Sequence, residues 1–296
     1  MLQNKKNKIF NILKKLNLSN DKSIELFHNR TRDNKKIKVL RCKKSGVLFL
    51  SSTDHLENHY EKKMDYGWMT NSSRSTSMKK YSEDDKRRKK QIVKYVKNKC
   101  WLDIGTGTGG ILKLLKKDAA KIIAVEPITF ARENLIEQGY NSFKSIHEID
   151  KLEKFDFVSL FHVFEHMDNP INDLRAIYKK LKKGGKIFIE VPHARDFLIH
   201  FLNLKEFKDF TFWSEHLILH TKESLTKFIK AAGFKIVSIE GFQRYSIKNH
   251  MYWIKEKKPQ GDKYLENLNT NMVNQNYIDF LISNNMTDTI ICVAKK

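Results

Sequence analysis

Four glycines within six residues, at positions 105–110, constrain the fold of this chain more than any other stretch. The segment before them, 99–104, is a short apolar run that begins with a lysine, which predicts a buried strand. The segment after them, 111–117, has the apolar spacing of a helix and ends in lysines. A strand, a glycine turn and a helix start form a cradle for a nucleotide, because glycine lets a ligand approach the backbone and the helix start offers free N–H groups.

Two classes of cofactor bind such a cradle. Gly105, Gly107 and Gly110 satisfy G-x-G-x-x-G, and with Glu126 at the end of the next expected strand they suit a nicotinamide dinucleotide. Asp103 lies two residues before the first glycine, where a carboxylate repels a pyrophosphate and attracts a cationic, amine-bearing cofactor. The residues therefore favour the cationic cofactor and leave the dinucleotide as the alternative.

Asp-x-Gly-x-Gly-x-Gly at 103–109 resembles motif I of the class I S-adenosylmethionine-dependent methyltransferases. The resemblance implies S-adenosyl-L-methionine as cofactor, with Asp103 near its methionine moiety. Gly105 and Gly107 would line that moiety, and Glu126 would take the ribose hydroxyls. The remaining expected contacts to this cofactor are Thr106, Gly109 and Phe161. An adenine contact is expected at Ile146 or His147.

Alternating strands and helices around the cradle predict an α/β fold with a doubly wound sheet, and seven strands with a late hairpin fit the class I methyltransferase fold. The expected strands after the first are 121–126, a short one within 143–149, 155–161, 186–192, 235–240 and 289–294. We expect an N-terminal accessory segment at 1–81 and a methyltransferase domain at 82–296. An acceptor-side insertion is expected within this domain at 243–286, before the last strand.

The accessory segment is expected to hold a basic helix, a hairpin and a lid. Residues 1–18 place apolar side chains on one helical stripe, which would allow weak peripheral contact with a membrane. Residues 36–50 have the pattern of a hairpin, and the aromatic side chains within 60–77 suit a lid over the cofactor. Ser82 is the expected N-cap of a helix that runs to Lys99.

The hairpin resembles the small zinc module of many bacterial sugar methyltransferases. Ser45 stands where C-x-x-C-G needs its second cysteine, after Cys42. Because zinc needs about four ligands, we predict no metal at this turn.

The chain of 296 residues carries 56 Lys and Arg against 34 Asp and Glu, a formal net charge of +22. Positions 1–100 hold 27 basic and 10 acidic residues, a surplus of 17. Such a surplus attracts anions, including RNA, but no arginine-rich run or aromatic-basic RNA motif accompanies it. Nucleic acid is therefore not the favoured partner. Three cysteines and no apolar run of membrane-spanning length predict a cytoplasmic protein.

Residues 161–167 form the second informative stretch, at the carboxyl end of the fourth expected strand, where open α/β sheets build their sites. Glu165-His166 followed by Asp-Asn-Pro at 168–170 resembles ubiquinone-pathway O-methyltransferases and bacterial sugar methyltransferases. The resemblance implies that His166 takes a proton from the acceptor and that Glu165 orients it, since His titrates near neutrality. The alternative is that both residues only cap the next helix.

Some O-methyltransferases with this motif, including those that act on small-RNA ends, hold a divalent ion with Glu-x-x-Glu-His and a later histidine. The matching positions here are His162, Glu165, His166 and His216. Because His162 replaces the first Glu, we predict no metal and keep His162 and His216 as further catalytic candidates.

Acceptor contacts are expected from Arg244, Tyr245 and His193, since Arg suits a phosphate or carboxylate and Tyr suits the face of a sugar. The insertion also resembles methyltransferases of surface-polysaccharide pathways. We therefore predict a methyltransferase acting on a sugar, a nucleotide-sugar or a surface-glycan precursor. The alternatives are an RNA methyltransferase using the basic N-terminal region, a nicotinamide-dependent oxidoreductase and a non-catalytic cofactor-binding interaction protein.

Overall fold

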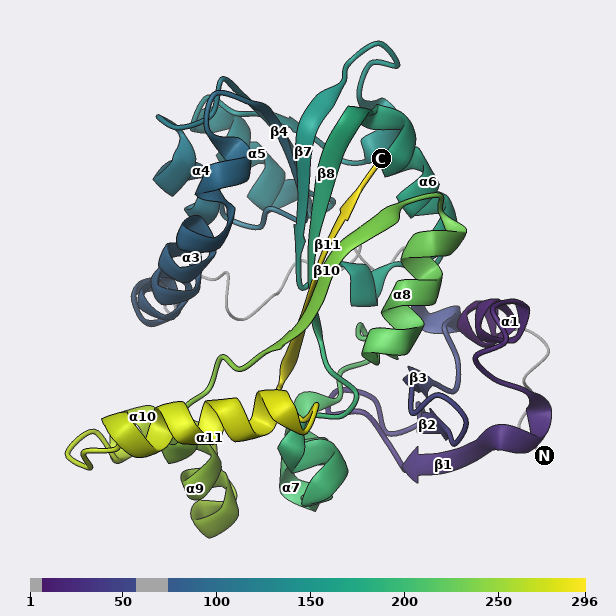
Figure 1. The fold of residues 1–296 in the computed structure, drawn as a ribbon, viewed down its shortest axis with the longest axis vertical. Helices are drawn as coiled ribbons and strands as arrows, with labels where there is room; N and C mark the ends of the chain where they lie inside the picture. Colours follow the sequence, from purple (N-terminus) through teal and green to yellow (C-terminus); the bar gives the residue numbers. More distant parts are fainter. Residues whose placement is uncertain (1–6, 57–73) are drawn as a thin grey trace.

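A seven-stranded sheet forms the centre of the molecule in the computed structural model, which describes residues 7–56 and 74–296 (Figure 1). The strand order is β10-β11-β8-β7-β4-β5-β6. Its strands are β4 (Cys100–Ile104), β5 (Lys121–Val125), β6 (Asn141–Phe143), β7 (Phe155–Phe161), β8 (Leu181–Pro192), β10 (Lys235–Phe242) and β11 (Thr289–Lys295). All neighbours are parallel except β11, which is antiparallel to both β8 and β10. This arrangement confirms the predicted α/β sheet with a late hairpin.

Helices cover both faces of this sheet (Figure 1). One face carries α3 (Arg74–Val96), α4 (Gly110–Leu115) and α5 (Thr129–Glu137), whose buried Ile92, Leu112 and Leu135 share one apolar cluster. The other face carries α6 (Pro170–Lys180) and α8 (Lys222–Ala231), which belong to a second cluster. The strands contribute to both clusters because each is buried on both faces, as expected for a parallel sheet.

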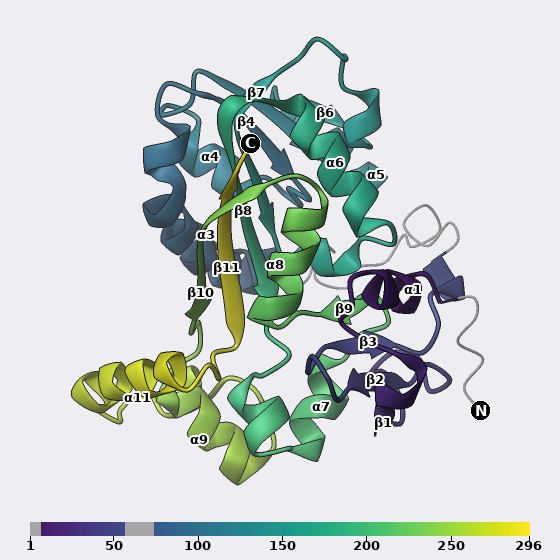
Figure 2. The same cartoon turned by 45° about the vertical axis from the view of Figure 1, so that its right-hand side comes forward.

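A smaller sheet lies beside the first and has the order β1-β2-β3-β9 (Figure 2). Its strands are β1 (Ile24–His28), β2 (Val39–Cys42), β3 (Leu48–Leu50) and β9 (Ile218–Leu219). The β2–β3 pair is the predicted hairpin. The fourth strand comes from the methyltransferase segment, so the N-terminal region and the larger sheet share one core.

The remaining helices are short. They are α1 (Lys8–Lys15), α7 (Lys205–Thr211), α9 (Ile247–Glu256), α10 (Gly261–Tyr264) and α11 (Asn271–Ser283). The short helical turns are η2 (Asp21–Ser23), η3 (Asp54–Leu56), η4 (Ile146–Glu148), η5 (Phe164–His166) and η6 (Phe197–Phe201). Among the described residues, the structure has no helix that combines the length and the apolar character needed to cross a membrane.

Three local predictions need correction. The helix expected to start at Ser82 starts at Arg74, because no Gly or Pro interrupts the chain between them. The strand expected at 186–192 begins earlier, at Leu181, so β8 includes the glycines at 184 and 185 and is out of register with β7 near its start. The apolar stripe of α1 is buried in the protein, with Ile9 and Leu13 inaccessible to solvent, so this helix has no apolar face free for a membrane. Most of the lid predicted within 60–77 lies outside the described residues, which omit 57–73.

Candidate active site

The glycine turn after β4 has the backbone that only glycine adopts readily. Gly105, Gly107 and Gly109 have positive φ angles of 71°, 59° and 81°. A Cβ on Gly105 would meet the Val163 side chain at 2.2 Å, whereas one on Gly107 would meet nothing within 4 Å. The turn is therefore packed against the β7 end at Gly105 and open for a ligand at Gly107.

Asp103 is held inside the sheet. Ser159 on β7 donates a hydrogen bond of 2.5 Å from its hydroxyl to Asp103 Oδ1, and Trp101 Nε1 donates to the same hydroxyl at 2.7 Å. Burial raises the pKa of the Asp103 carboxyl to about 7, against the lowering effect of the Ser159 bond. Thr106, also a predicted contact, donates its hydroxyl to the Asp103 carbonyl. These bonds fix the start of the turn.

Glu126 braces the other side of the turn. Its carboxylate accepts hydrogen bonds from Gly107 N at 2.7 Å and from Ile128 N at 2.9 Å. Burial raises its pKa, while these backbone bonds oppose the rise. The predicted ribose contact would share the same oxygens and stays a prediction.

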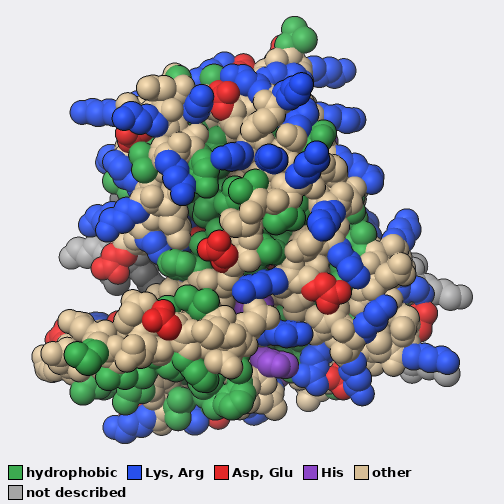
Figure 3. All heavy atoms as spheres, in the orientation of Figure 1, with side chains coloured by type: hydrophobic (Ala, Val, Ile, Leu, Met, Phe, Trp, Pro, Cys, Tyr) green, Lys and Arg blue, Asp and Glu red, His purple; other side chains and the backbone are tan. Residues whose placement is uncertain are grey.

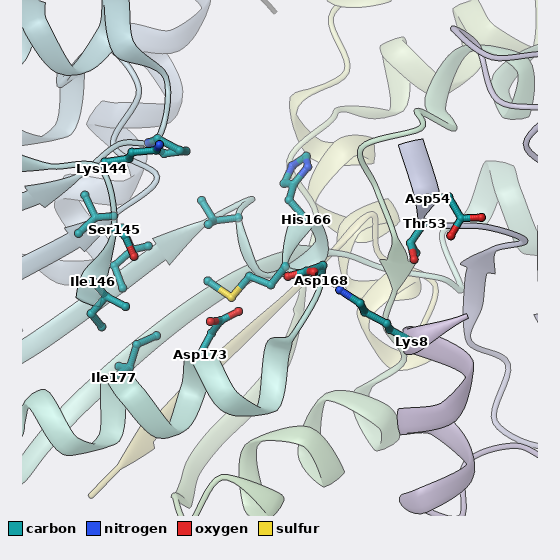
Figure 4. A pocket seen from close by; sticks show the side chains of 15 residues that line it. Lys8, Thr53, Asp54, Lys144, Ser145, Ile146, His166, Asp168, Asp173 and Ile177 are labelled. Carbon is teal, nitrogen blue, oxygen red and sulfur yellow. Dashed lines mark hydrogen bonds and ion pairs between the residues drawn. The ribbon is translucent and has the colours of Figure 1, made fainter. Parts of the chain in front are cut away.

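A pocket of about 440 Å³ opens next to the turn (Figure 4). Its lining is formed by Lys8, Thr53, Asp54, Ile104, Val125, Pro127, Lys144, Ser145, Ile146, Val163, His166, Met167, Asp168, Asp173 and Ile177. The ends of β4 and β5 and the segment after β6 supply apolar walls that fit an adenosine group. Ile146, one of the two predicted adenine contacts, lies on this wall, and His147 does not line the pocket.

The opposite part of the pocket is polar. Figure 4 shows Lys8, Thr53 and Asp54 of the N-terminal region on one side and His166 and Asp168 between them and the apolar wall. Lys8 Nζ lies 2.8 Å from Asp168 Oδ2. The pocket thus joins an apolar end to an end with hydrogen-bonding groups.

His166 has one defined tautomer. Its Nδ1 lies 2.9 Å from the Glu215 carbonyl oxygen, which can only accept, so Nδ1 carries the hydrogen and Nε2 keeps its lone pair. Nε2 lies 4.0 Å from Glu165 Oε1. The Glu215 carbonyl thus holds the ring through Nδ1, while Glu165 lies on the Nε2 side at charge-interaction distance and beyond hydrogen-bond reach.

Glu165 is a fully buried carboxylate without a hydrogen-bond partner on either oxygen among the described residues. Burial by itself raises its pKa, but His162 and then His166 outweigh that effect and lower the pKa of Glu165 to about 2. His162 Nδ1 lies 3.3 Å away, at ion-pair distance but outside hydrogen-bond geometry. Glu165 is therefore a negative charge that its neighbours must balance.

His216 lies against His166, with ring centroids 4.9 Å apart. The ligand atoms of Glu165, His166 and His216 all lie within 4.8 Å of one another, a spacing that a divalent ion could bridge. Burial lowers the pKa of His216 to about 4, so it stays neutral at physiological pH. The prediction of no metal remains a prediction.

His162 connects Glu165 to a second buried carboxylate. Its Nε2 lies 3.3 Å from Glu190 Oε1, and its φ of 54° is unusual for a residue with a side chain. Arg87 and Arg88 of α3 donate to Glu190 at 2.7 and 2.9 Å. The sequence analysis missed Glu190, although its place at the carboxyl end of β8 is a signal for a site residue. Phe161 contributes the face over which the Arg88 guanidinium lies, at 4.8 Å.

The three predicted acceptor contacts lie elsewhere. Arg244, Tyr245 and His193 are absent from the described residues that line the pocket. Asp288 accepts from Arg244 N at 2.9 Å and from Arg244 Nε at 3.4 Å, and His193 Nδ1 lies 2.9 Å from the Thr287 carbonyl. Their acceptor contacts, like the acceptor-side position of the insertion, stay predictions.

Two N-terminal residues that sequence reasoning missed hold the loop of His216. Asp33 accepts from the Ser214 backbone N at 2.9 Å and from its hydroxyl at 2.6 Å. His55 Nε2 lies 2.6 Å from the Ser214 carbonyl. Leu217 N then donates to the Glu165 carbonyl at 2.9 Å, which fixes the loop against η5. No local sequence pattern predicts these contacts, because they join residues far apart in the chain.

A family model described as a methyltransferase domain matches residues 77–239. The ubiquinone biosynthesis O-methyltransferase of Aliivibrio fischeri (strain ATCC 700601 / ES114) is 30% identical over 96 residues, 29% of this chain and 41% of that enzyme. The corresponding enzyme of Stutzerimonas stutzeri is 25% identical over 165 residues, 51% of this chain and 70% of that enzyme. The chain therefore spans less than half of the first relative's length.

Solved structures show the same fold. A SAM-dependent methyltransferase from Archaeoglobus fulgidus superposes with a TM-score of 0.51 at 24% identity, over 73% of this chain and 94% of that one. A putative methyltransferase of Haloferax volcanii, solved with the Trm112 activator, has a TM-score of 0.54 at 13% identity, over 77% and 96% of the two chains. The family model covers more than half of the 296 residues, and the chain belongs to the methyltransferase domain family.

Proposed function

We propose that this methyltransferase uses S-adenosyl-L-methionine to methylate a hydroxyl group of a small polar acceptor. The observation that carries the proposal is His166, which lines the pocket, keeps a lone pair on Nε2 and has the buried Glu165 carboxylate 4.0 Å from that nitrogen. A hydroxyl must lose its proton as the methyl group arrives, so it needs a base at this place.

When bound, S-adenosyl-L-methionine supplies an electrophilic methyl carbon, whose bond to sulfur breaks as the acceptor oxygen bonds to it. The acceptor proton passes to His166 Nε2, and the resulting imidazolium is stabilised by Glu165. The Glu215 carbonyl holds the ring in the reactive tautomer. The open backbone at Gly107 and the apolar wall at Ile104 and Ile146 would hold the donor.

For the acceptor we favour a sugar, a nucleotide-sugar or a surface-glycan precursor. The polar end of the pocket supports this class, because Thr53, Asp54 and Asp168 offer hydrogen-bonding oxygens to hydroxyl groups. Apolar atoms alone would suit a plain aromatic ring better. A phenol is the second candidate, because several relatives are named ubiquinone biosynthesis O-methyltransferases.

The other functions weighed from sequence have less support. Membership of the methyltransferase family does not support a nicotinamide-dependent oxidoreductase or a non-catalytic interaction protein. An RNA methyltransferase stays an alternative that rests on the basic N-terminal region alone. Binding to RNA that persists at moderate salt would favour it, whereas nonspecific charge contacts weaken steeply with salt.

A panel of acceptors tests the proposal. The purified protein is incubated with S-adenosyl-L-methionine carrying a radioactive methyl group and with UDP-, GDP- and dTDP-hexoses, catechol or RNA, and products are identified by mass spectrometry. We expect O-methylation of a hexose or, as the second candidate, of catechol. Methyl transfer to nitrogen or carbon, or to RNA alone, would reject the proposal.

A further inference from the structure

The insertion between β10 and β11 exposes many large apolar side chains. Figure 3 shows hydrophobic atoms gathered over α9–α11. The exposed members, here called the insertion face, are Met251, Ile254, Tyr264, Leu268, Met272, Val273, Phe280 and Ile282. Met272 is 83% exposed, which is extreme for an apolar side chain of this size. Apolar patches of this kind usually mark interaction sites.

Ring contacts join the elements that carry this face. Tyr252 of α9 stacks on Tyr264 at 5.1 Å, and Tyr277 of α11 stacks on Phe280 at 6.4 Å. Phe197 of η6 lies 6.0 Å from Tyr277. These contacts join α9 to α10 and α11 to η6.

Lysines border the insertion face. Lys255, Lys257, Lys258 and Lys263 are all exposed, and the insertion as a whole carries six basic against four acidic residues. A second copy of the chain would bring like charges together across a symmetric interface. An anionic surface matches the charge and the apolar area at once.

The insertion face lies at the edge of the sheet where the site is built. Phe242, at the end of β10, pairs with Thr289 of β11, which pairs with Pro192 at the end of β8. The insertion follows Phe242 directly, so it leaves the sheet at the carboxyl edge that also carries His162 and His166. A surface bound to the insertion face therefore lies on the same side of the molecule as the pocket.

We propose that the insertion face docks on an anionic lipid bilayer. Apolar side chains enter the boundary between headgroups and acyl chains, and the lysines pair with anionic headgroups. For the acceptor, this inference rests on the proposed function: docking would present a hydroxyl-bearing headgroup of a lipid-anchored acceptor to the pocket. The docking itself does not depend on methyl transfer.

Vesicle co-sedimentation tests the docking. The full chain is mixed with vesicles of phosphatidylcholine alone or with phosphatidylglycerol added. We expect binding only to the anionic vesicles, and a loss of at least tenfold in affinity for Met272→Glu/Val273→Glu. Lys255→Glu/Lys258→Glu should lose about fivefold or more for each lysine, since one charge near an anionic surface contributes about that factor.

The matched control is Lys151→Glu/Leu152→Glu. Leu152 is 86% exposed, and it lies before β7, at the opposite edge of the sheet. This variant should bind anionic vesicles as the unaltered chain does. All these positions are exposed, so circular dichroism should show unchanged folding.

Three results would overturn the proposal. They are no binding of the unaltered chain, equal losses in the control and test variants, and a dimer in sedimentation velocity that Met272→Glu/Val273→Glu dissociates. The last result would assign the face to a second copy. Turnover of a water-soluble acceptor is measured on the same samples: its absence counts against the proposed function and leaves the docking result unaffected.

Discussion

Glu165→Gln tests the acid/base pair most directly, because it removes one charge and keeps the shape of the side chain. Glu165 is fully buried, and its Oε1 lies 4.0 Å from His166 Nε2. At an effective dielectric constant of about 20, unit charges at this distance attract by about 4 kcal/mol. With the proton about half transferred in the transition state, about 2 kcal/mol of this attraction assists the reaction. The expected loss in kcat is therefore about 30-fold.

The assay measures methyl transfer to an acceptor found active in the panel, together with the affinity for S-adenosylhomocysteine by calorimetry. Glu165→Gln should lower kcat and leave this affinity nearly unchanged, since Glu165 does not line the pocket. Glu240→Gln, at an exposed position of β10, is the matched control and should keep full activity.

A double variant separates the proposed role from a general disturbance of the site. His166→Ala should lower kcat by about 10²- to 10⁴-fold, the usual contribution of a general base. Adding Glu165→Gln to His166→Ala should then cost little more, because Glu165 acts through His166. Undiminished kcat in Glu165→Gln, or fully multiplicative losses in the double variant, would refute the reasoning.

Four further predictions follow from named contacts. Gly105→Ala should lower the melting temperature more than Gly107→Ala, because its Cβ would lie 2.2 Å from Val163, and Gly107→Ala should mainly weaken donor binding in calorimetry. Glu190→Gln should destabilise the protein by about 3–5 kcal/mol in urea unfolding, since Arg87 and Arg88 lose a buried anion. Dialysis against EDTA should leave kcat unchanged, because a histidine base needs no cation; a loss restored by zinc or manganese would make Glu165, His166 and His216 metal ligands. Burial raises the pKa of Asp196 to about 7, so between about pH 4 and 7 the folded protein holds a proton that the unfolded chain releases, and the free energy of unfolding should fall as the pH rises through this range. Asp196→Asn should flatten this pH dependence in urea unfolding. An unchanged slope would contradict the assignment.

The central sheet could be predicted because its signals are local. Residues 99–110 contain the strand, the positive-φ glycines and the helix start in one stretch. The order of elements in the resembled family then predicts where each later strand lies in the chain. For the same reason Glu165 and His166 could be identified from the sequence, since they closely follow β7. Helix ends were less accurate: α3 begins at Arg74, and the expected N-cap Ser82 lies inside it, because no Gly or Pro interrupts the chain between them.

The acceptor contacts could not be predicted in the same way. Arg244 and His193 have side chains suited to a ligand, but Asp288 and the Thr287 carbonyl bind them, and both partners lie far along the chain. A single sequence shows which groups a residue can bind and not which partner reaches it first. Residue type alone therefore does not distinguish a ligand contact from a bond to another buried polar group.

The N-terminal region illustrates the same limit from the other side. The sequence marks residues 1–81 as an accessory segment because their composition differs, yet β3 pairs with β9, a strand of only two residues from the methyltransferase segment. That pairing, with the bonds from Ser214 to Asp33, fixes the loop that carries His216. The Glu215 carbonyl of the same loop accepts the hydrogen bond from His166 Nδ1. Lys8, Thr53 and Asp54 then complete the polar end of the pocket. The polar end of the pocket is therefore as much N-terminal as it is part of the methyltransferase segment, and the N-terminal contribution follows from tertiary contacts alone.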